Sequence, residues 1–259
     1  MLRNFRELYN YRALLWSLTQ RELNARYRGS LLGFFWTFLN PMLHMLVYML
    51  VFGFFMKQRV PNYTYFIFVG LLPWIWFSTS IAGGVVAISS RRDLLTKVRF
   101  PAQVLPATVV ASNFFNYLLS LPLMVLLGLL FGVWPTWHAL LFPLIALLQF
   151  AFTLGLCYVI SALNVTFRDL QHIVGNVVML WFFVTPVLYR VETIPEQFRN
   201  WVLILNPAAA LINAYQQIFY DHQLPDPKPL AWVALLSFVL LWAASQLFER
   251  RREEFAEFV

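Results

Sequence analysis

The sequence predicts an all-α integral membrane protein with six transmembrane helices, an amphipathic N-terminal interface helix, and short re-entrant external helices between spans 5 and 6. Of its 259 residues, 60% are hydrophobic and only 12% are charged, whereas soluble domains carry about 25% charged residues. The apolar residues form runs long enough to cross a bilayer. Lys and Arg gather between these runs, as they do in the loops of membrane proteins. No internal repeat or linker is visible, so we expect one domain over residues 1–259.

Residues 1–30 are expected to form a helix that lies in the membrane interface. They hold six basic and two acidic residues and no continuous apolar core, which does not fit a cleavable signal peptide. Arg residues between the apolar positions would face anionic headgroups. The helix either anchors the N-terminus or transmits force into the first span through Arg26 to Gly29. Its apolar residues recur at roughly helical spacing: Leu8, Tyr11, Leu15, Leu18 and Leu23.

Six later segments are long and apolar enough to span a membrane, since a spanning helix needs about 20 such residues. Several of them contain proline, which predicts kinks, because neighbouring helices can satisfy the freed backbone groups. The expected spans are 31–56, 65–89, 104–132, 138–163, 170–189 and 230–248, and the prolines are Pro41, Pro73, Pro122, Pro143 and Pro186.

The distribution of positive charge predicts the topology. With a cytoplasmic N-terminus, 14 of the 19 Lys and Arg residues fall in inside segments, a strong positive-inside bias. Both termini are therefore expected in the cytoplasm, with 31–248 as the six-span bundle and 249–259 as a cytoplasmic tail. Orientation in the membrane explains the net charge of +7 better than a nucleic-acid partner does.

The external segment 190–229 is expected to hold the re-entrant helices. Ile194-Pro195 begins a short element, Asn206-Pro207 interrupts it, and a largely apolar stretch follows to Tyr220. Neither part is long enough to span the membrane alone. A hairpin over 194–220 that dips into the bundle is the main prediction. A helical cap lying on the outer surface is the alternative.

Several kinds of chemistry are missing from the sequence. It contains no Gly-x-x-x-x-Gly-Lys-Ser/Thr phosphate loop, so the chain is not itself a P-loop ATPase. No carboxylate falls well inside a predicted span, which argues against ion-coupled transport and against acid–base catalysis in the membrane. The single Cys157 allows no disulfide framework. No metal site is expected from the scattered histidines His44, His138, His172 and His222.

Two charged turns interrupt the apolar pattern on the expected cytoplasmic side. The first holds Arg91, Asp93 and Lys97 around Leu94 and Leu95, which is the layout of a small amphipathic docking element. Simple positive-inside charge is the alternative explanation. The second turn, between the fourth and fifth spans, carries Phe167, Arg168 and Asp169.

These features together resemble the membrane subunit of ABC-2-type exporters, in the polysaccharide and teichoic acid branch. Each motif is weak alone, but the set is ordered and covers nearly the whole chain. The motifs are Arg21-Glu22-Leu23; Arg26-Tyr27-Arg28-Gly29-Ser30 with Gly33, Trp36 and Pro41; Leu72-Pro73-Trp74 with Phe77; Leu95-x-Lys97 with Phe100-Pro101; Asn164-x-x-Phe167-Arg168-Asp169; Thr185-Pro186-x-x-Tyr189; and Asn206-Pro207.

The resemblance implies a permease, not an enzyme, in the bacterial cytoplasmic (inner) membrane. Such permeases form homodimers and pair with two copies of an ATPase, which binds ATP and Mg; no cofactor is implied for this chain. Its cargo would be a lipid-linked glycan, as in O-antigen export for lipopolysaccharide biosynthesis or in teichoic acid export. By position, Arg91, Asp93, Leu94, Leu95 and Lys97 would form the ATPase-coupling helix, and Arg26, Tyr27 and Arg28 the cytoplasmic gate.

Aromatic side chains are suited to a glycan channel, because their faces stack on sugar rings without fixing them by charge. We therefore expect some of the aromatics in the first and fifth spans to line the channel; the alternative is contact with lipid. Other functions stay open: an ABC-2 exporter of a small drug or lipid, an enzyme acting on polyprenyl lipids, or a membrane scaffold. The candidate channel aromatics are Tyr48, Phe52, Phe55, Trp181, Phe182, Phe183 and Tyr189.

Overall fold

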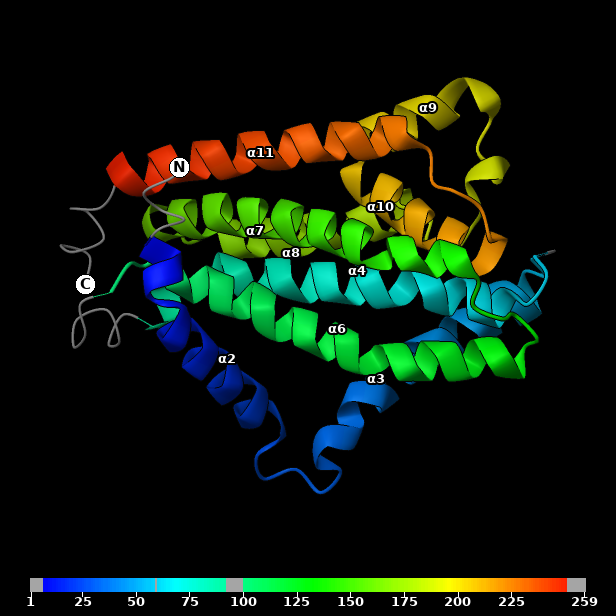
Figure 1. Ribbon diagram of the computed structural model, residues 1–259, viewed down its shortest axis with the longest axis horizontal. Coiled ribbons are helices and arrows are strands. Elements are labelled where there is room, and N and C mark those ends of the chain that lie inside the picture. The colour runs from blue at the N-terminus through cyan, green and yellow to red at the C-terminus, as the bar shows by residue number, and fades with distance from the viewer. Residues whose placement is uncertain (1–6, 59, 92–99, 251–259) are drawn as a thin grey trace.

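The computed structural model describes residues 7–58, 60–91 and 100–250, and within them it contains helices and no strands. Figure 1 shows long helices lying side by side in a bundle, with the start of α2 and the end of α11 at the same end. The principal helices are α2 (Arg12–Tyr27), α3 (Trp36–Tyr48), α4 (Tyr63–Val85), α6 (Val104–Leu130), α7 (Phe142–Thr166), α8 (Leu170–Val184), α9 (Glu196–Leu205), α10 (Pro207–Gln216) and α11 (Pro227–Arg250).

Five described helices are long and apolar enough to cross a membrane, and each matches a predicted span. Some include short 3-10 or π segments: η1 (Gly33–Phe35) and η2 (Met49–Phe55) flank α3, and η4 (Trp137–Leu141) precedes α7. At 1.5 Å per residue, such helices reach or exceed the bilayer core of about 30 Å. The five are Gly33–Phe55, Tyr63–Val85, Val104–Leu130, Trp137–Thr166 and Pro227–Arg250.

The fifth predicted span, 170–189, is shorter in the structure than expected. Helix α8 has 15 residues and ends at Val184, so it is only about 22 Å long. Thr185 already has an extended backbone (φ −90°, ψ 133°), because the ring of Pro186 disfavours a helical conformation for the residue before it. Pro186 therefore ends the helix, where a kink was predicted.

The hairpin predicted over residues 194–220 forms as a bent pair of helices. The axis turns by 107° between α9 and the segment Pro207–Asp221, which contains α10 and the π-helix η6 (Gln217–Asp221). Asn206 caps α10, because its side chain accepts a hydrogen bond from the Ala209 amide at 3.0 Å. Helix α10 is almost entirely buried, whereas Leu203 is the one buried residue of α9. One arm therefore enters the bundle and the other stays near its surface.

Helix α4 forms the centre of the core. Trp76 is 1% exposed and its ring stacks on that of Tyr117 in α6, with centroids 5.2 Å apart. Small residues allow neighbouring helices to approach closely: a Cβ atom at Gly84 would lie 2.6 Å from the Cys157 Sγ of α7. The core thus holds α4, α6 and α7 in fixed register, which positions the polar groups described next.

The N-terminal helix packs on α6. Leu8, Leu15 and Leu18 pack against the bundle, as their spacing predicted, while Leu23 is half-buried and Tyr11 is exposed. Trp16 lies edge-on to Phe115, with ring centroids 5.3 Å apart. The chain then turns into η1 through Gly29 and Gly33, whose positive φ angles (79° and 48°) permit the sharp corner.

Candidate functional site

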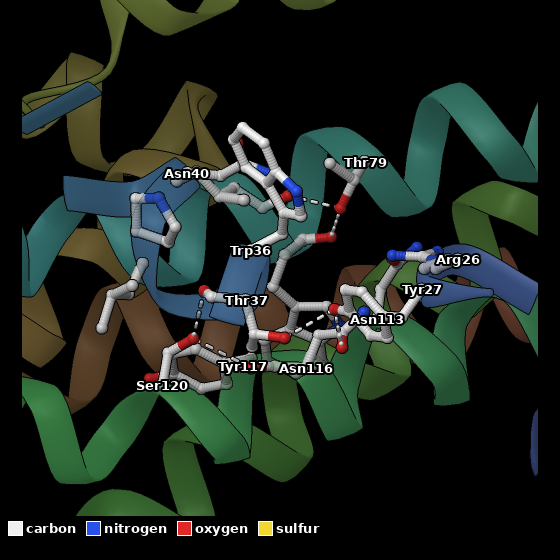
Figure 2. Close-up of a pocket in the computed structure, with 14 residues that line it drawn as sticks. Arg26, Tyr27, Trp36, Thr37, Asn40, Thr79, Asn113, Asn116, Tyr117 and Ser120 are labelled. Atoms are coloured by element: carbon white, nitrogen blue, oxygen red, sulfur yellow. Dashed lines mark hydrogen bonds between the residues drawn. The ribbon is translucent and has the colours of Figure 1, made fainter. Parts of the chain in front are cut away.

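A pocket lined by both polar and apolar residues lies where α2 ends against α3, α4 and α6 (Figure 2). Its volume is about 140 Å³. Arg26 and Tyr27 enter from the end of α2, and the other polar groups come from spans that are otherwise apolar. The polar and aromatic lining residues are Arg26, Tyr27, Trp36, Thr37, Asn40, Trp76, Thr79, Asn113, Asn116, Tyr117 and Ser120.

Three hydrogen bonds join α2 to the spans. The Arg26 guanidinium donates from Nη2 to Asn113 Oδ1 at 2.7 Å. The Tyr27 hydroxyl lies 2.6 Å from the Thr37 hydroxyl and 3.1 Å from Asn116 Oδ1. Asn113 is about 14 Å into α6, a helix about 40 Å long. Arg26 itself is exposed, and Asn113 gives its guanidinium a polar partner beside an apolar span, where an unpaired charge would be costly.

Two further donors in the pocket wall are buried without a hydrogen-bond partner among the described residues: Trp76 Nε1 and Asn113 Nδ2. Their residues are only 1% and 2% exposed. A buried donor without an acceptor costs about 1–3 kcal/mol. Together with Arg26, they make a pocket suited to acceptor-rich groups, such as phosphate or sugar oxygens, or to water.

The predicted gate residues do not all reach this pocket. Arg26 and Tyr27 line it, but Arg28 does not; it is exposed beyond the end of α2. Asn113, Asn116 and the other amide and hydroxyl partners were not predicted. The available signal was an uncharged polar residue inside an apolar span, which usually faces protein in a membrane bundle.

The predicted coupling turn is described only up to Arg91. The Arg91 guanidinium forms an ion pair with the Glu22 carboxylate of α2, and both side chains are about one-quarter exposed (25% and 28%). The pair ties α2 to the segment that follows α4. Asp93, Leu94, Leu95 and Lys97 lie outside the described residues.

The turn between α7 and α8 contacts the same region through its first motif residue. Asn164 donates from Nδ2 to the Ser89 hydroxyl at 3.3 Å, just before Arg91. Phe167 is 51% exposed, and Arg168 and Asp169 are exposed as well. The structure thus brings Asn164, and not the charged pair, against the end of α4.

The candidate channel aromatics separate into two groups. Phe182 is 7% exposed, stacks on Tyr48 with centroids 5.3 Å apart, and contacts Trp74. Trp181 is fixed by a hydrogen bond from its Nε1 to Asn206 Oδ1 at 2.7 Å. These contacts lie within one copy of the chain. Phe55 and Phe183 are exposed, and Phe52 and Tyr189 are half-buried. A channel-lining role stays a prediction for all seven aromatics.

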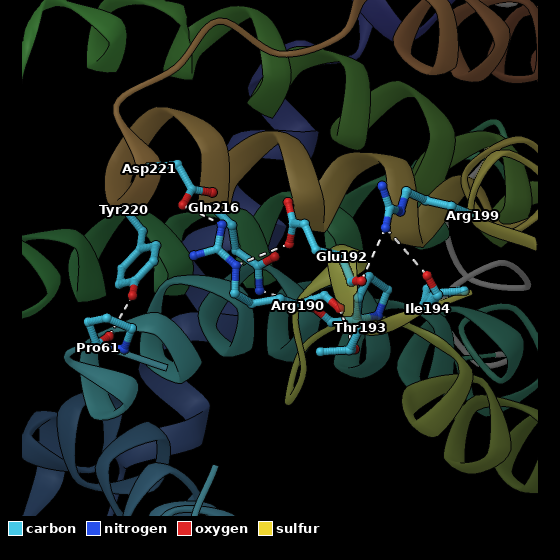
Figure 3. A network of polar contacts seen from close by, with 10 residues as sticks. Pro61, Arg190, Glu192, Thr193, Ile194, Arg199, Gln216, Tyr220 and Asp221 are labelled. Carbon is cyan, nitrogen blue, oxygen red and sulfur yellow. Dashed lines mark hydrogen bonds and ion pairs between the residues drawn. The ribbon is translucent and has the colours of Figure 1, made fainter. Parts of the chain in front are cut away.

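A second polar cluster, at the end of the bundle opposite the start of α2, was not predicted (Figure 1 and Figure 3). Arg190 donates from Nη2 to Asp221 at 2.8 Å and from Nε to Glu192 at 3.0 Å. Burial acts to raise the pKa of the Glu192 carboxyl, but the hydrogen bond from Arg190 and the charges of Arg190 and Arg199 outweigh it, so this pKa is lowered. The sequence signal was an Arg directly after the Thr185-Pro186-x-x-Tyr189 motif.

Comparison with known proteins agrees with this architecture. A family model described as ABC-2 type transporter matches residues 13–220. The chain is 64% identical over 258 residues (99% of each chain) to the O-antigen export system permease protein RfbA of Myxococcus xanthus. It is 31% identical over 245 residues (94% of each) to a Klebsiella pneumoniae protein of the same name. It is 23% identical over 247 residues, 92% of this chain and 93% of the relative, to the Escherichia coli polysialic acid transport protein KpsM.

Proposed function

The chain belongs to the ABC-2 type transporter family, and from this premise we propose that it is the membrane permease of a polysaccharide exporter, with O-antigen as its cargo. The observation that carries the proposal is 64% identity over 99% of an O-antigen export permease. The five described spanning helices, the short α8 and the polar pocket suit such a permease.

ATP hydrolysis would be supplied by a separate P-loop ATPase, because the chain has no phosphate loop of its own. We propose that the ATPase docks at the turn after α4, on the cytoplasmic side. The ion pair between Arg91 and Glu22 supports this, because it connects that turn to α2. The ATPase would bind ATP and Mg.

We also propose that two copies of the chain form the path for the polysaccharide. Helices α3 and α8 carry many exposed apolar side chains, among them Leu46 (56%), Leu180 (62%) and Phe183 (57%). A pocket of about 140 Å³ holds only a few water-sized groups, so a polymer needs a wider passage. A second copy facing α3 and α8 would enclose one between apolar and aromatic walls.

The pocket at Arg26 is proposed as the place where the phosphate-bearing end of the lipid-linked glycan enters. Arg26 offers a charged donor, and Trp76 and Asn113 offer buried donors without partners among the described residues. Both chain ends would be cytoplasmic, which matches the charge bias of the loops. The pocket would then open from the inner half of the cytoplasmic membrane.

A deletion strain tests the proposal. Loss of this gene is expected to remove surface O-antigen and to leave lipid-linked glycan inside the cell, and restoring the gene should reverse both effects. Co-purification with a separately encoded ABC ATPase tests the partner. Normal surface glycan in the deletion strain would refute the function.

A capsule-type glycan is the second candidate cargo, because two relatives are polysialic acid transport proteins at 23% identity. Analysis of the glycan that accumulates in the deletion strain separates the two cargoes. Accumulation of a drug or a simple lipid in place of a glycan would favour the small-molecule exporter.

A further inference from the structure

The outer hairpin, defined as α9, α10 and η6 (Glu196–Asp221), is closed at its base by one ion pair. Arg190 precedes the hairpin and Asp221 is its last residue, and their side chains are joined at 2.8 Å (Figure 3). The Asp221 side chain is only 16% exposed. A charge-assisted bond with so little solvent contact is stronger than an ordinary surface ion pair.

Each partner of this ion pair sits on a locally fixed segment. On one side, Arg199 of α9 donates to the backbone oxygen atoms of Glu192 (3.1 Å) and Ile194 (3.5 Å), which fixes the start of α9. On the other side, the Gln223 amide donates to Gln217 O at 2.9 Å and closes η6. The Arg190–Asp221 bond therefore joins two segments that are each held by further hydrogen bonds: the segment before α9 and the end of η6.

The two arms of the hairpin differ in how firmly they are held. Helix α10 is buried almost throughout, and Gln216 donates to Pro186 O at 3.0 Å. Helix α9 has one buried residue, Leu203. Segments with few buried contacts open at low cost. If the ion pair separates, α9 is the arm free to turn about Asn206, which stays bonded to Trp181.

The Arg190–Asp221 ion pair, called the clasp from here on, is also connected to the start of α4. The Arg190 guanidinium lies 5.6 Å from the centre of the Tyr220 ring, within range of a cation–π contact. The Tyr220 hydroxyl donates to the carbonyl oxygen of Pro61, shortly before α4 begins. Movement of α4 would therefore reach the clasp directly.

We propose that Arg190 and Asp221 are positioning residues that hold the α9 arm closed over the outer end of the bundle, and that this clasp must open for the polysaccharide to leave. The inference rests on the proposed export function. It assigns the moving part to α9 and the fixed part to α10, and it predicts separate effects of breaking and of locking the clasp.

Locking is tested in the full transporter complex with an Arg190→Cys/Asp221→Cys variant and a short, reversible bis-methanethiosulfonate cross-linker. Cross-linking is expected to lower export at least tenfold, and a reductant is expected to restore it. The single-cysteine variants, treated identically, are the controls, and native Cys157 is fully buried. Undiminished export by fully cross-linked protein would overturn the proposal.

Breaking is tested by thiol labelling, which does not depend on export. A cysteine at Val202, half-buried against Val191 and Leu203, is expected to react several-fold faster when Asp221→Asn is added. A cysteine at Leu205, which is already 73% exposed, is the matched control and should not change. Equal labelling of the Val202 cysteine with and without Asp221→Asn would show that the pair does not hold the arm. If the unmodified protein exports no glycan, the proposed function fails instead.

Discussion

The ion pair between Glu22 and Arg91 makes a testable link between α2 and the turn after α4. We expect Glu22→Arg and Arg91→Glu each to weaken this contact, because each places two like charges side by side. The double variant Glu22→Arg/Arg91→Glu restores opposite charges at the same two positions. Among the described residues this is the side-chain contact that both partners share, so the double variant tests it most directly.

The size of the effect follows from the burial of the pair. The two side chains are 25% and 28% exposed. Fully exposed pairs contribute about 0.2–1 kcal/mol, while two unit charges 4 Å apart near a protein surface interact with about 4 kcal/mol before desolvation. We therefore expect each reversal to cost about 1–4 kcal/mol and the double variant to recover most of it.

Two assays measure the effect of the Glu22–Arg91 ion pair, one on stability and one on export. Thermal unfolding of the purified protein should show a lower midpoint for each single variant and a recovered midpoint for the double variant. Export per ATP hydrolysed by the complex should follow the same order if the turn carries the ATPase stroke to α2. Arg21→Glu, on the exposed side of α2, is the control and should leave both unchanged.

The reasoning about the pair is refuted if the double variant has an unfolding midpoint and an export per ATP no higher than those of the more impaired single variant. Recovery of the unfolding midpoint without recovery of export would separate the two roles. The contact would then stabilise α2, while the conformational change of the ATPase would reach the spans by another route.

Three further substitutions test the core, the hairpin and the pocket. Gly84→Ala should lower the unfolding midpoint, because its Cβ would lie 2.6 Å from Cys157 Sγ, and adding Cys157→Ala should recover part of the loss. Asn206→Ala should cost about 1–3 kcal/mol, since it removes the α10 cap and the acceptor for Trp181; Asn206→Asp keeps the acceptor and should cost less in a denaturation assay. Asn113→Ala removes the partner of Arg26 and should lower export several-fold, whereas Asn24→Ala, at an exposed position of α2 outside the pocket, should export normally.

The fold could be predicted largely because the bilayer imposes one length on every span. The runs that become α4, α6, α7 and α11 are apolar for more than 20 residues and need no knowledge of their neighbours. The hairpin was also visible, because Asn206-Pro207 combines a capping side chain with a residue suited to the first helical turn. Local chemistry was sufficient for these elements.

The end of α8 could not be predicted, because Pro186 allows two outcomes. A proline inside a membrane helix is tolerated where neighbours satisfy the freed backbone groups, and the sequence does not say whether they do. Here Gln216, 30 residues further along, donates to Pro186 O. The extended backbone is thus stabilised by a tertiary contact that no local pattern contains.

The pocket was missed for a related reason. Asn113 and Asn116 stand in a run whose average hydropathy is that of a spanning helix, so they are hidden within it. Arg26 and Tyr27 were predicted near a gate, but their partners lie 87 and 89 residues away. Only the packing of α2 on α6 brings the guanidinium to the amide, and that packing depends on leucines that look the same in any amphipathic helix.

Helix α4 connects the two polar regions of the molecule. Its outer end is bonded to the hairpin and to the chain before it, since Tyr63 donates to Leu188 O at 2.6 Å and Tyr65 to Phe219 O at 3.5 Å. Its other end leads to Arg91 and the contact with α2. Helix α4 is packed on nearly all sides, so a shift of one part of it disturbs contacts along its length. We therefore expect a displacement of α4 to be felt at the base of the outer hairpin, where the Arg190–Asp221 pair lies; thiol labelling of the Val202 cysteine with and without Arg91→Glu measures it.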